Sequence, residues 1–211
     1  MPILQRLGVW EELSQIGIRK DAAEFESHMH GKTVCFEFSQ AFDKRWPHAF
    51  QVRRSEFDHM LLRNAATKGA RVHEGARVTS VEFGNLARNE DTVVTLKLDD
   101  GATQVWRTRF LVDASGRDTF LSDRFGIKRK NKKHASAALF GHFRNARRNP
   151  GSAEGNITIV WFAHGWFWFI PLKDGTTSVG AVCWPRYLKS RTTDPTTFFM
   201  QTIAMAPEIS A

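Results

Sequence analysis

The chain has 211 residues, of which 42% are hydrophobic and 25% charged, the composition of a globular domain that can bury a sizeable core. Its net charge of +8 allows an acidic partner, but the two cysteines, Cys35 and Cys183, are too few for a disulfide framework or a zinc site. No run of eighteen apolar residues or signal peptide is present, so we expect a cytoplasmic protein without a membrane span or a metal site.

The first third of the chain predicts two short helical segments, a strand and one longer helix. Apolar residues recur at helical spacing over residues 2–16, where Gly8 interrupts them, and residues 32–38 alternate like a strand. Residues 54–68 predict a helix that ends at Gly69 and whose apolar face carries Phe57, Leu61, Leu62 and Ala65.

Two sets of strands follow. The first has a hairpin turn at Asp99-Asp100-Gly101 and comprises residues 70–74, 77–84, 92–98 and 103–112, followed by a helical turn over 118–126. The second is antiparallel and comprises residues 135–144, 156–163, 166–172 and 176–184. A helix over 194–206 is expected to begin with Asp194 as its N-cap. The order predicts a mixed α/β (α+β) fold with a large antiparallel sheet.

Two segments suit a phosphate-bearing ligand. The apolar run Phe110-Leu111-Val112 leads into Asp113-Ala114-Ser115-Gly116, where small residues let a ligand approach the backbone. Arg53 and Arg54 stand at the start of the predicted helix, where free N–H groups and guanidinium groups favour anions. Taken singly, a plain turn and a surface arginine pair are the alternatives.

The most specific pattern is Gly165-Trp166-Phe167-Trp168-Phe169-Ile170-Pro171. On a strand, Trp166, Trp168 and Ile170 share one face, which could wall a flat cavity, although a strand buried on both faces reads the same way. The basic run over residues 128–134 is typical of a solvated loop, and no nucleic-acid-binding signature accompanies it.

Together these segments resemble the flavin-dependent halogenases and related FAD-dependent monooxygenases, which include the geranylgeranyl-reductase-like enzymes. Residues 165–171 match the Trp-x-Trp-x-Ile-Pro motif of the halogenases, and Lys20 precedes Ala22-Ala23-Glu24-Phe25 as the halogenase lysine precedes its own small-small-x-Phe stretch. The resemblance implies a partial FAD-binding domain of the p-hydroxybenzoate-hydroxylase type over residues 1–134, with 20–50 inserted toward the substrate side. Residues 135–211 would form the substrate-domain sheet and the start of a helix.

The resemblance also implies roles for individual residues. Lys20 would be catalytic. The contacts to FAD would come from Arg54, Val78, Asp113 and Gly116. The partition between flavin and substrate would be formed by Trp166, Trp168 and Pro171.

The implied activity is that of an FAD-dependent oxidoreductase. Reduced FAD from a partner flavin reductase, oxygen and halide would give hypohalous acid, which Lys20 directs onto a small activated aromatic substrate through a hydrogen bond or a haloamine. In a variant of this hypothesis, the basic surface docks an acidic carrier protein that bears the substrate.

Three family segments have no counterpart in this sequence: the Gly-x-Gly-x-x-Gly turn that holds the pyrophosphate, the C-terminal Gly-Asp motif and the Pro-x-Ser-x-Gly stretch beside the flavin ring. We therefore expect a fragment that binds FAD weakly and has no measurable halogenation on its own. The first alternative is a monooxygenase or reductase of the same fold without halogenation. The second is a non-catalytic basic protein that binds through residues 128–134.

Overall fold

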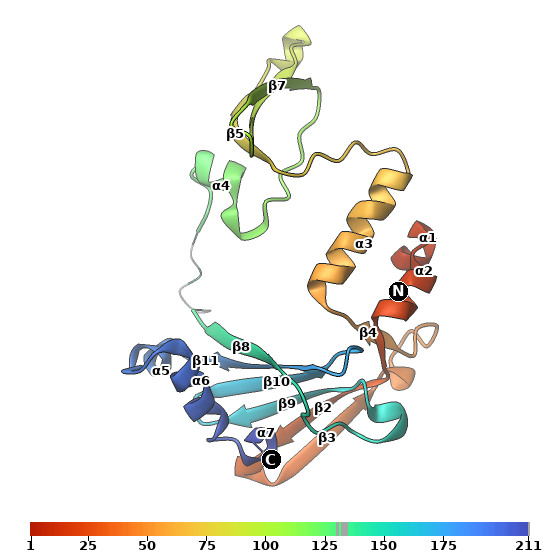
Figure 1. The fold of residues 1–211 in the computed structure, drawn as a ribbon, viewed down its shortest axis with the longest axis vertical. Coiled ribbons are helices and arrows are strands. Elements are labelled where there is room, and N and C mark those ends of the chain that lie inside the picture. The colour runs from red at the N-terminus through yellow and green to blue at the C-terminus, as the bar shows by residue number, and fades with distance from the viewer. Residues whose placement is uncertain (130, 132–134, 211) are drawn as a thin grey trace. The chain divides into compact units, whose positions relative to one another are not determined.

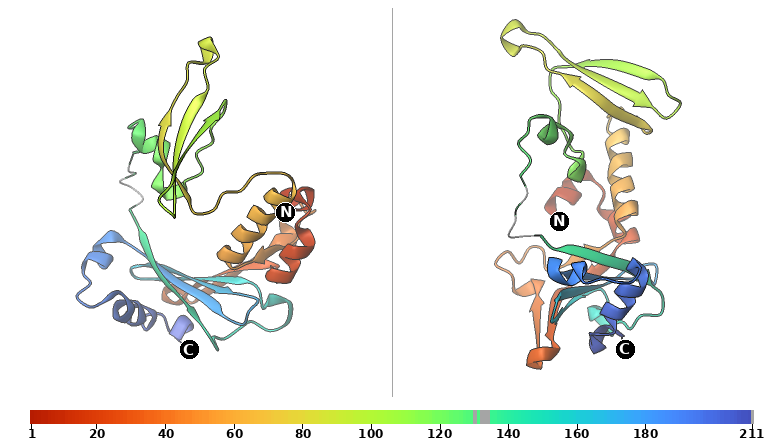
Figure 2. Two further views of the ribbon diagram at one scale, coloured as in Figure 1. Left: turned by 45° about the horizontal axis from the view of Figure 1, so that its top comes forward. Right: turned by 90° about the vertical axis from the view of Figure 1, so that its left-hand side faces the viewer.

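The computed structural model describes residues 1–129, 131 and 135–210. Contacts divide the chain into two compact units, residues 1–69 with 133–211 and residues 70–132. The first unit has a six-stranded and a two-stranded sheet, and the second unit has a three-stranded sheet (Figures 1 and 2). Two hydrophobic clusters lie in the first unit and one in the second. The boundaries of these units differ from the boundary between residues 134 and 135 that the sequence predicts for the two functional domains. That division into functional domains stays a prediction. Among the described helices, none is long and apolar enough to cross a membrane.

The predicted N-terminal helices are confirmed as α1 (Pro2–Leu7), α2 (Trp10–Ile16) and α3 (Arg54–Thr67). Pro2 starts α1, where its missing N–H costs no hydrogen bond, and Gly8 ends it in the left-handed conformation with φ 77°. On α3, however, the deeply buried residue is Met60, which packs with Val9 and Leu13, whereas Leu62 is 39% exposed. The predicted apolar face of this helix was therefore rotated by a fraction of a turn.

The first unit contains a six-stranded sheet in the order β3-β2-β9-β10-β11-β8. Its strands are β2 (Ala22–Ser27), β3 (Lys32–Glu37), β8 (Ala137–Phe143), β9 (Ile157–Phe162), β10 (Gly165–Pro171) and β11 (Thr177–Cys183). The predicted antiparallel set is confirmed in β8 to β11, and β2 joins it through a parallel pairing with β9. A small two-stranded sheet pairs β1 (Ile18–Lys20) with β4 (Ala49–Gln51).

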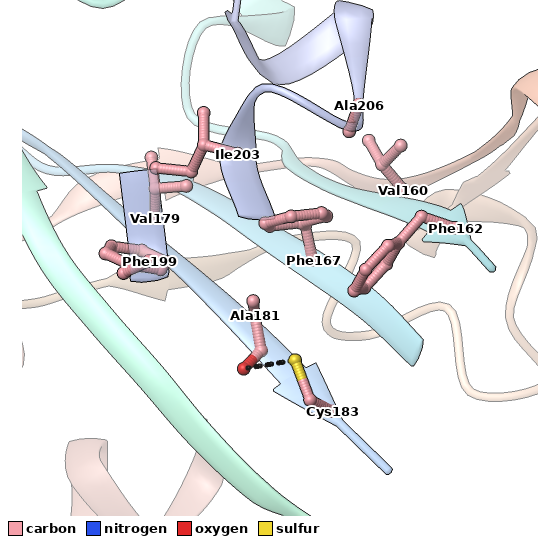
Figure 3. Close-up of a cluster of buried hydrophobic side chains, with 9 residues drawn as sticks. All are labelled: Val160, Phe162, Phe167, Val179, Ala181, Cys183, Phe199, Ile203 and Ala206. Atoms are coloured by element: carbon pink, nitrogen blue, oxygen red, sulfur yellow. Dashed lines mark hydrogen bonds between the residues drawn. The ribbon is translucent and has the colours of Figure 1, made fainter. Parts of the chain in front are cut away.

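Helices cover one face of the large sheet. They are α5 (Pro185–Lys189), α6 (Pro195–Ile203) and α7 (Pro207–Ser210), and α6 packs Phe199 and Ile203 over the strands (Figure 3). On this side Phe167 is fully buried, so the odd-numbered residues of β10 face the core. The predicted helix over 194–206, with Asp194 as its N-cap, is confirmed as α6, which ends at Ile203, and Pro207 starts the separate short helix α7.

The second unit is a three-stranded antiparallel sheet of β5 (Ala76–Glu82), β6 (Thr92–Leu98) and β7 (Thr103–Thr108), followed by α4 (Phe120–Arg124). Two predicted strand segments are wrong. Residues 70–74 form no strand, and β7 ends at Thr108, so that residues 110–112 are unpaired. Among the described residues no neighbouring strand accepts their backbone hydrogen bonds, and Phe110 and Val112 are 85% and 86% exposed.

Candidate functional site

Lys20 is the last residue of β1 and lies half-buried beside an aromatic ring. Its Nζ atom is 5.3 Å from the centroid of the Phe38 ring, within the range of a cation–π contact. Burial lowers the pKa of the Lys20 ammonium, because removing the charged form from water is unfavourable. At a given pH, Lys20 is therefore more often a neutral, nucleophilic amine than a fully solvated lysine is.

No carboxylate neutralises this ammonium within the part of the chain that the structure describes. The nearest acidic residue in sequence, Asp21, is paired with Arg19 instead, at 2.8 Å between Oδ1 and Nη2. Arg19 and Asp21 flank Lys20 and point to the side away from it, as alternate residues of an extended segment do. The lysine is thus left free to interact with a ligand.

The Trp166 and Trp168 side chains lie together on the sheet face opposite α6. Their ring centroids are 6.2 Å apart, and Phe140 of β8 lies 6.1 Å from Trp168. On the same face Trp161, the register partner of Trp166, is 46% exposed and Phe140 is 62% exposed. We call this surface the tryptophan face, defined by Phe140, Trp161, Trp166 and Trp168. It offers a broad, accessible aromatic area of the kind that flat ligands stack on.

Trp168 has a fixed orientation. Its ring lies over Gly180, the register partner on β11, so closely that an ideal Cβ at Gly180 would be 2.6 Å from Trp168 Cη2. The indole Nε1 donates a hydrogen bond to Ser178 Oγ at 3.2 Å. The plane of the Trp168 ring is therefore set by Gly180, which has no side chain beneath the ring, and by the Ser178 hydroxyl at the ring edge.

Pro171 does not join the two tryptophans. As an odd-numbered residue of β10 it is buried on the opposite face, where it lines a cavity of about 490 Å³ together with Phe169 and Val179. The structure thus brings Trp166 and Trp168 together and separates Pro171 from them by the thickness of the sheet.

The two arginines at the start of α3 differ in their surroundings. Arg54 is 80% exposed and forms an i,i+4 ion pair with Asp58 at 3.1 Å, an arrangement that leaves its guanidinium accessible. Arg53 binds Asp174 and donates to Thr176 Oγ1 at 3.0 Å, so it ties α3 to the β10–β11 turn. The local residue pattern did not separate the two, because the partners of Arg53 lie more than a hundred residues away, whereas the family resemblance singled out Arg54.

The remaining predicted FAD contacts are in the second unit. Val78 is half-buried in β5 against the cluster of Val81, Val94 and Leu96. Asp113 accepts hydrogen bonds from the backbone N–H groups of Ser115 at 2.9 Å and Leu121 at 2.8 Å. The Ser115 hydroxyl and these N–H groups hold the pKa of Asp113 below its ordinary value, and the carboxylate thereby organises the turn before α4.

Gly116 follows in this turn with φ 64°, a conformation that favours glycine, and nothing lies within 4 Å of a Cβ built there. The backbone is therefore open to a ligand at this position. Residues 130 and 132–134 of the basic run lie outside the described residues, whereas Lys128 approaches Asp123 at 3.5 Å.

Comparisons with known proteins give one consistent picture. The family model described as tryptophan halogenase matches residues 5–205. A tryptophan 2-halogenase of Chondromyces crocatus is 31% identical over 192 residues, which are 90% of this chain and 35% of that protein. A 1H-pyrrole-2-carbonyl-[peptidyl-carrier protein] chlorinase of Pseudomonas fluorescens is 32% identical over 142 residues, 63% of this chain and 30% of that protein.

Solved structures agree. A flavoprotein/dehydrogenase of Cytophaga hutchinsonii superimposes with a TM-score of 0.88 at 29% identity, covering all of this chain and 50% of that one. The myxobacterial chondrochloren halogenase CndH, described as an FAD-dependent halogenase, gives 0.80 at 29% identity and covers 99% and 47% of the two chains. The chain therefore spans between about a third and a half of the length of these proteins, and it belongs to the tryptophan halogenase family of flavin-dependent enzymes.

Proposed function

We propose that this chain forms the lysine-bearing, tryptophan-walled part of the active site of a flavin-dependent halogenase. The observation that carries the proposal is Lys20, a half-buried ammonium with lowered pKa and no ion-pair partner among the described residues. An electrophilic halogen species needs such a group, because a carboxylate partner would hold the amine protonated and occupied.

The residues present fit FAD at several points. Within the first unit, the tryptophan face suits the edge or plane of an isoalloxazine ring, and the exposed Arg54 suits a phosphate of the polar chain. Within the second unit, the open backbone at Gly116 would suit such a chain, and Val78 and Asp113 are the further proposed contacts there. When bound, reduced FAD supplies the oxidising chemistry that converts halide and oxygen into hypohalous acid. The protein would supply placement and keep the flavin apart from the substrate.

Lys20 would act on hypohalous acid in one of two ways. As a neutral amine it forms an N–halogen bond while the O–halogen bond breaks, and the departing hydroxide takes the amine proton as water. The aromatic ring then takes the halogen, and its displaced proton restores the amine. As an ammonium, Lys20 instead donates a hydrogen bond to the acid oxygen and passes its proton to that oxygen when the ring attacks the halogen, so that water leaves; the proton displaced from the ring then restores the ammonium.

A small activated aromatic compound is the proposed substrate class, and a separate flavin reductase is the proposed source of reduced FAD. A carrier-bound substrate is compatible with the net charge of +8, because carrier proteins that are acidic would be attracted to a basic surface. The name of the pyrrole chlorinase states such a carrier for that relative.

The proposal is tested on the chain itself by exposure to hypobromous acid at neutral pH, followed by mass spectrometry of lysine peptides. Lys20 should be halogenated or oxidised faster than Lys32 and Lys68, both of which are exposed, since the neutral amine is the reacting species. Rates are compared among lysines of one sample, because methionine and cysteine consume part of the reagent. Modification of Lys20 no faster than that of Lys32 would contradict the proposal and favour a flavin enzyme without halogenation.

A second test addresses the tryptophan face. Lumiflavin, which has the flavin ring without phosphates, should quench the tryptophan fluorescence of the chain, and Trp168→Leu should weaken this quenching. Trp184→Leu is the matched control, because Trp184 is 43% exposed and lies beyond the end of β11. Equal loss of quenching in the two variants would show that lumiflavin does not select the tryptophan face.

A further inference from the structure

Lys20 stands where the chain passes from one sheet to another. It ends β1, which pairs with β4, and only Asp21 separates it from β2, which pairs with β9 and β3. The direction of the Lys20 side chain therefore depends on the backbone conformation at Asp21. A single linking residue of this kind has no ladder of its own to hold it.

The buried amide of Asn156 forms hydrogen bonds with the backbone at Asp21 and Ala22. Asn156 is 5% exposed, and its Oδ1 accepts hydrogen bonds from the N–H groups of Asp21 at 3.2 Å and Ala22 at 2.9 Å. Its Nδ2 donates to Glu24 Oε1 at 3.0 Å, which fixes the orientation of the amide. One side chain thus holds two consecutive backbone donors directly after Lys20.

The preceding residue, Gly155, lies against the backbone just before Lys20. A Cβ built on Gly155 would be 2.8 Å from the carbonyl carbon of Arg19 and would overlap its oxygen. Only glycine permits this approach, because any side chain would push β1 away. Gly155 and Asn156 therefore contact the chain on both sides of Lys20.

The same link also carries the ring that faces the lysine. The carbonyl of Asp21 accepts a hydrogen bond from the N–H of Phe38 at 2.9 Å. The N–H of Asp21 donates to Asn156, and the C=O of Asp21 accepts from Phe38. Lys20 and the Phe38 ring are therefore both attached to the backbone at Asp21. The separation of 5.3 Å between Lys20 Nζ and the ring centroid is a product of this arrangement.

We propose that Gly155 and Asn156 form a clamp on residues 19–22 that positions the Lys20 ammonium over Phe38, which makes Asn156 a positioning residue of the site. The importance of this position for catalysis rests on the proposed function, whereas the clamp itself does not. Asn156 touches neither substrate nor flavin in this scheme. It acts through the backbone of Asp21 and Ala22.

The test observes Lys20 directly, in the full chain with isotope-labelled lysine, by nuclear magnetic resonance. The Lys20 methylene signal next to Nζ, assigned with Lys20→Arg, should show an upfield ring-current shift that Phe38→Leu removes, and the amine should titrate below the ordinary lysine value. Asn156→Ala should lose most of the upfield shift and move the titration toward the ordinary lysine value. The double variant Glu24→Gln/Asn156→Asp keeps an oxygen at the same place and reverses the amide–carboxylate pair with Glu24, so it should retain the upfield shift.

Asn149→Ala is the matched control. Asn149 donates to the same Glu24 carboxylate, at 2.9 Å from Oε2, but does not touch residues 19–22. Its removal should leave the Lys20 signal unchanged, so any general effect of disturbing Glu24 is separated from the clamp. If Asn156→Ala is poorly folded, the comparison of Glu24→Gln/Asn156→Asp with Asn149→Ala still decides the matter.

The clamp is refuted if a folded Asn156→Ala variant keeps the wild-type shift and titration, or if Glu24→Gln/Asn156→Asp loses the shift while Asn149→Ala retains it. No flavin or halide is present in this experiment. If Lys20 shows the expected position but does not react with hypobromous acid, the proposed function is contradicted and the clamp is still supported.

Discussion

Replacing Gly180 by alanine should displace Trp168. The added Cβ would lie 2.6 Å from Trp168 Cη2 and nearer still to Cζ2 and Cε2, whereas Cβ contacts under 3.0 Å are essentially absent from real proteins. Because the obstacle is a rigid ring that lies over Gly180, it cannot move aside like the end of a flexible side chain. The indole must tilt away from β11, and its hydrogen bond to Ser178 Oγ is then lost.

The expected cost follows from these two effects. Overpacking costs about 1–3 kcal/mol, and a lost hydrogen bond costs about 0.5–1.5 kcal/mol. Since Trp168 is only half-buried and part of the strain can be released toward solvent, we expect about 2 kcal/mol. For a chain of this length that corresponds to a fall in melting temperature of about 4–8 °C.

The assay is thermal unfolding by calorimetry, combined with near-ultraviolet circular dichroism as a probe of the tryptophan environment. Gly141→Ala is the matched control, because Gly141 lies on the neighbouring strand β8 and a Cβ there would be 3.4 Å from Phe143 Cε2, an ordinary contact. This control should be neutral or more stable by up to about 1 kcal/mol. A Gly180→Ala variant with wild-type stability and an unchanged near-ultraviolet spectrum would refute the reasoning.

Three further outcomes are expected. Burial raises the pKa of the Cys183 thiol to about 11, so at pH 8 a thiol reagent should label the exposed Cys35 quickly and Cys183 only on unfolding; equal rates would contradict this. Asp194 accepts from the N–H groups of Thr196 and Thr197, so Asp194→Ala should lower the free energy of unfolding by about 1 kcal/mol in urea titrations, whereas Asp194→Ser should lose less. The Thr176 hydroxyl and Arg53 hold the pKa of Asp174 well below 3.8, so its stabilising effect is present above that pH and lost as the pH falls toward the lowered value. Asp174→Asn should therefore destabilise the chain at pH 6 and much less at pH 2; a constant difference would argue against the pair.

Local features of the sequence were sufficient to predict most helices and strands. Gly8 and Asp194 mark helix ends through their own backbone and side-chain chemistry, and the alternation in β8 to β11 reflects one buried face. The strand β2 was missed because Glu24 and Glu26 interrupt its apolar pattern. Glu24 is accommodated there by the amides of Asn149 and Asn156, which are distant in sequence.

The candidate site shows the same division. Alternation along β10 was enough to pair Trp166 with Trp168, and the same counting would have placed Pro171 on the other face, where the structure has it. By contrast, the contact between Asn156 and Asp21 joins residues 135 positions apart and leaves no trace in either local pattern. The unpaired stretch 110–112 illustrates the opposite error, since its apolar residues predict a strand that needs a neighbour to form.

The parallel pairing of β2 with β9 has a consequence for biosynthesis. Ala23 is in register with Ile157, so the hairpin of β2 and β3 leaves the ribosome long before its neighbour has been translated. Until β9 has been translated, one edge of β2 is unpaired. The pairing of β2 with β9 must then close the long chain segment between Ala23 and Ile157, which is slow. Because the backbone next to Lys20 is held by Asn156, the position of the Lys20 amine can be fixed only after residue 156 has been translated.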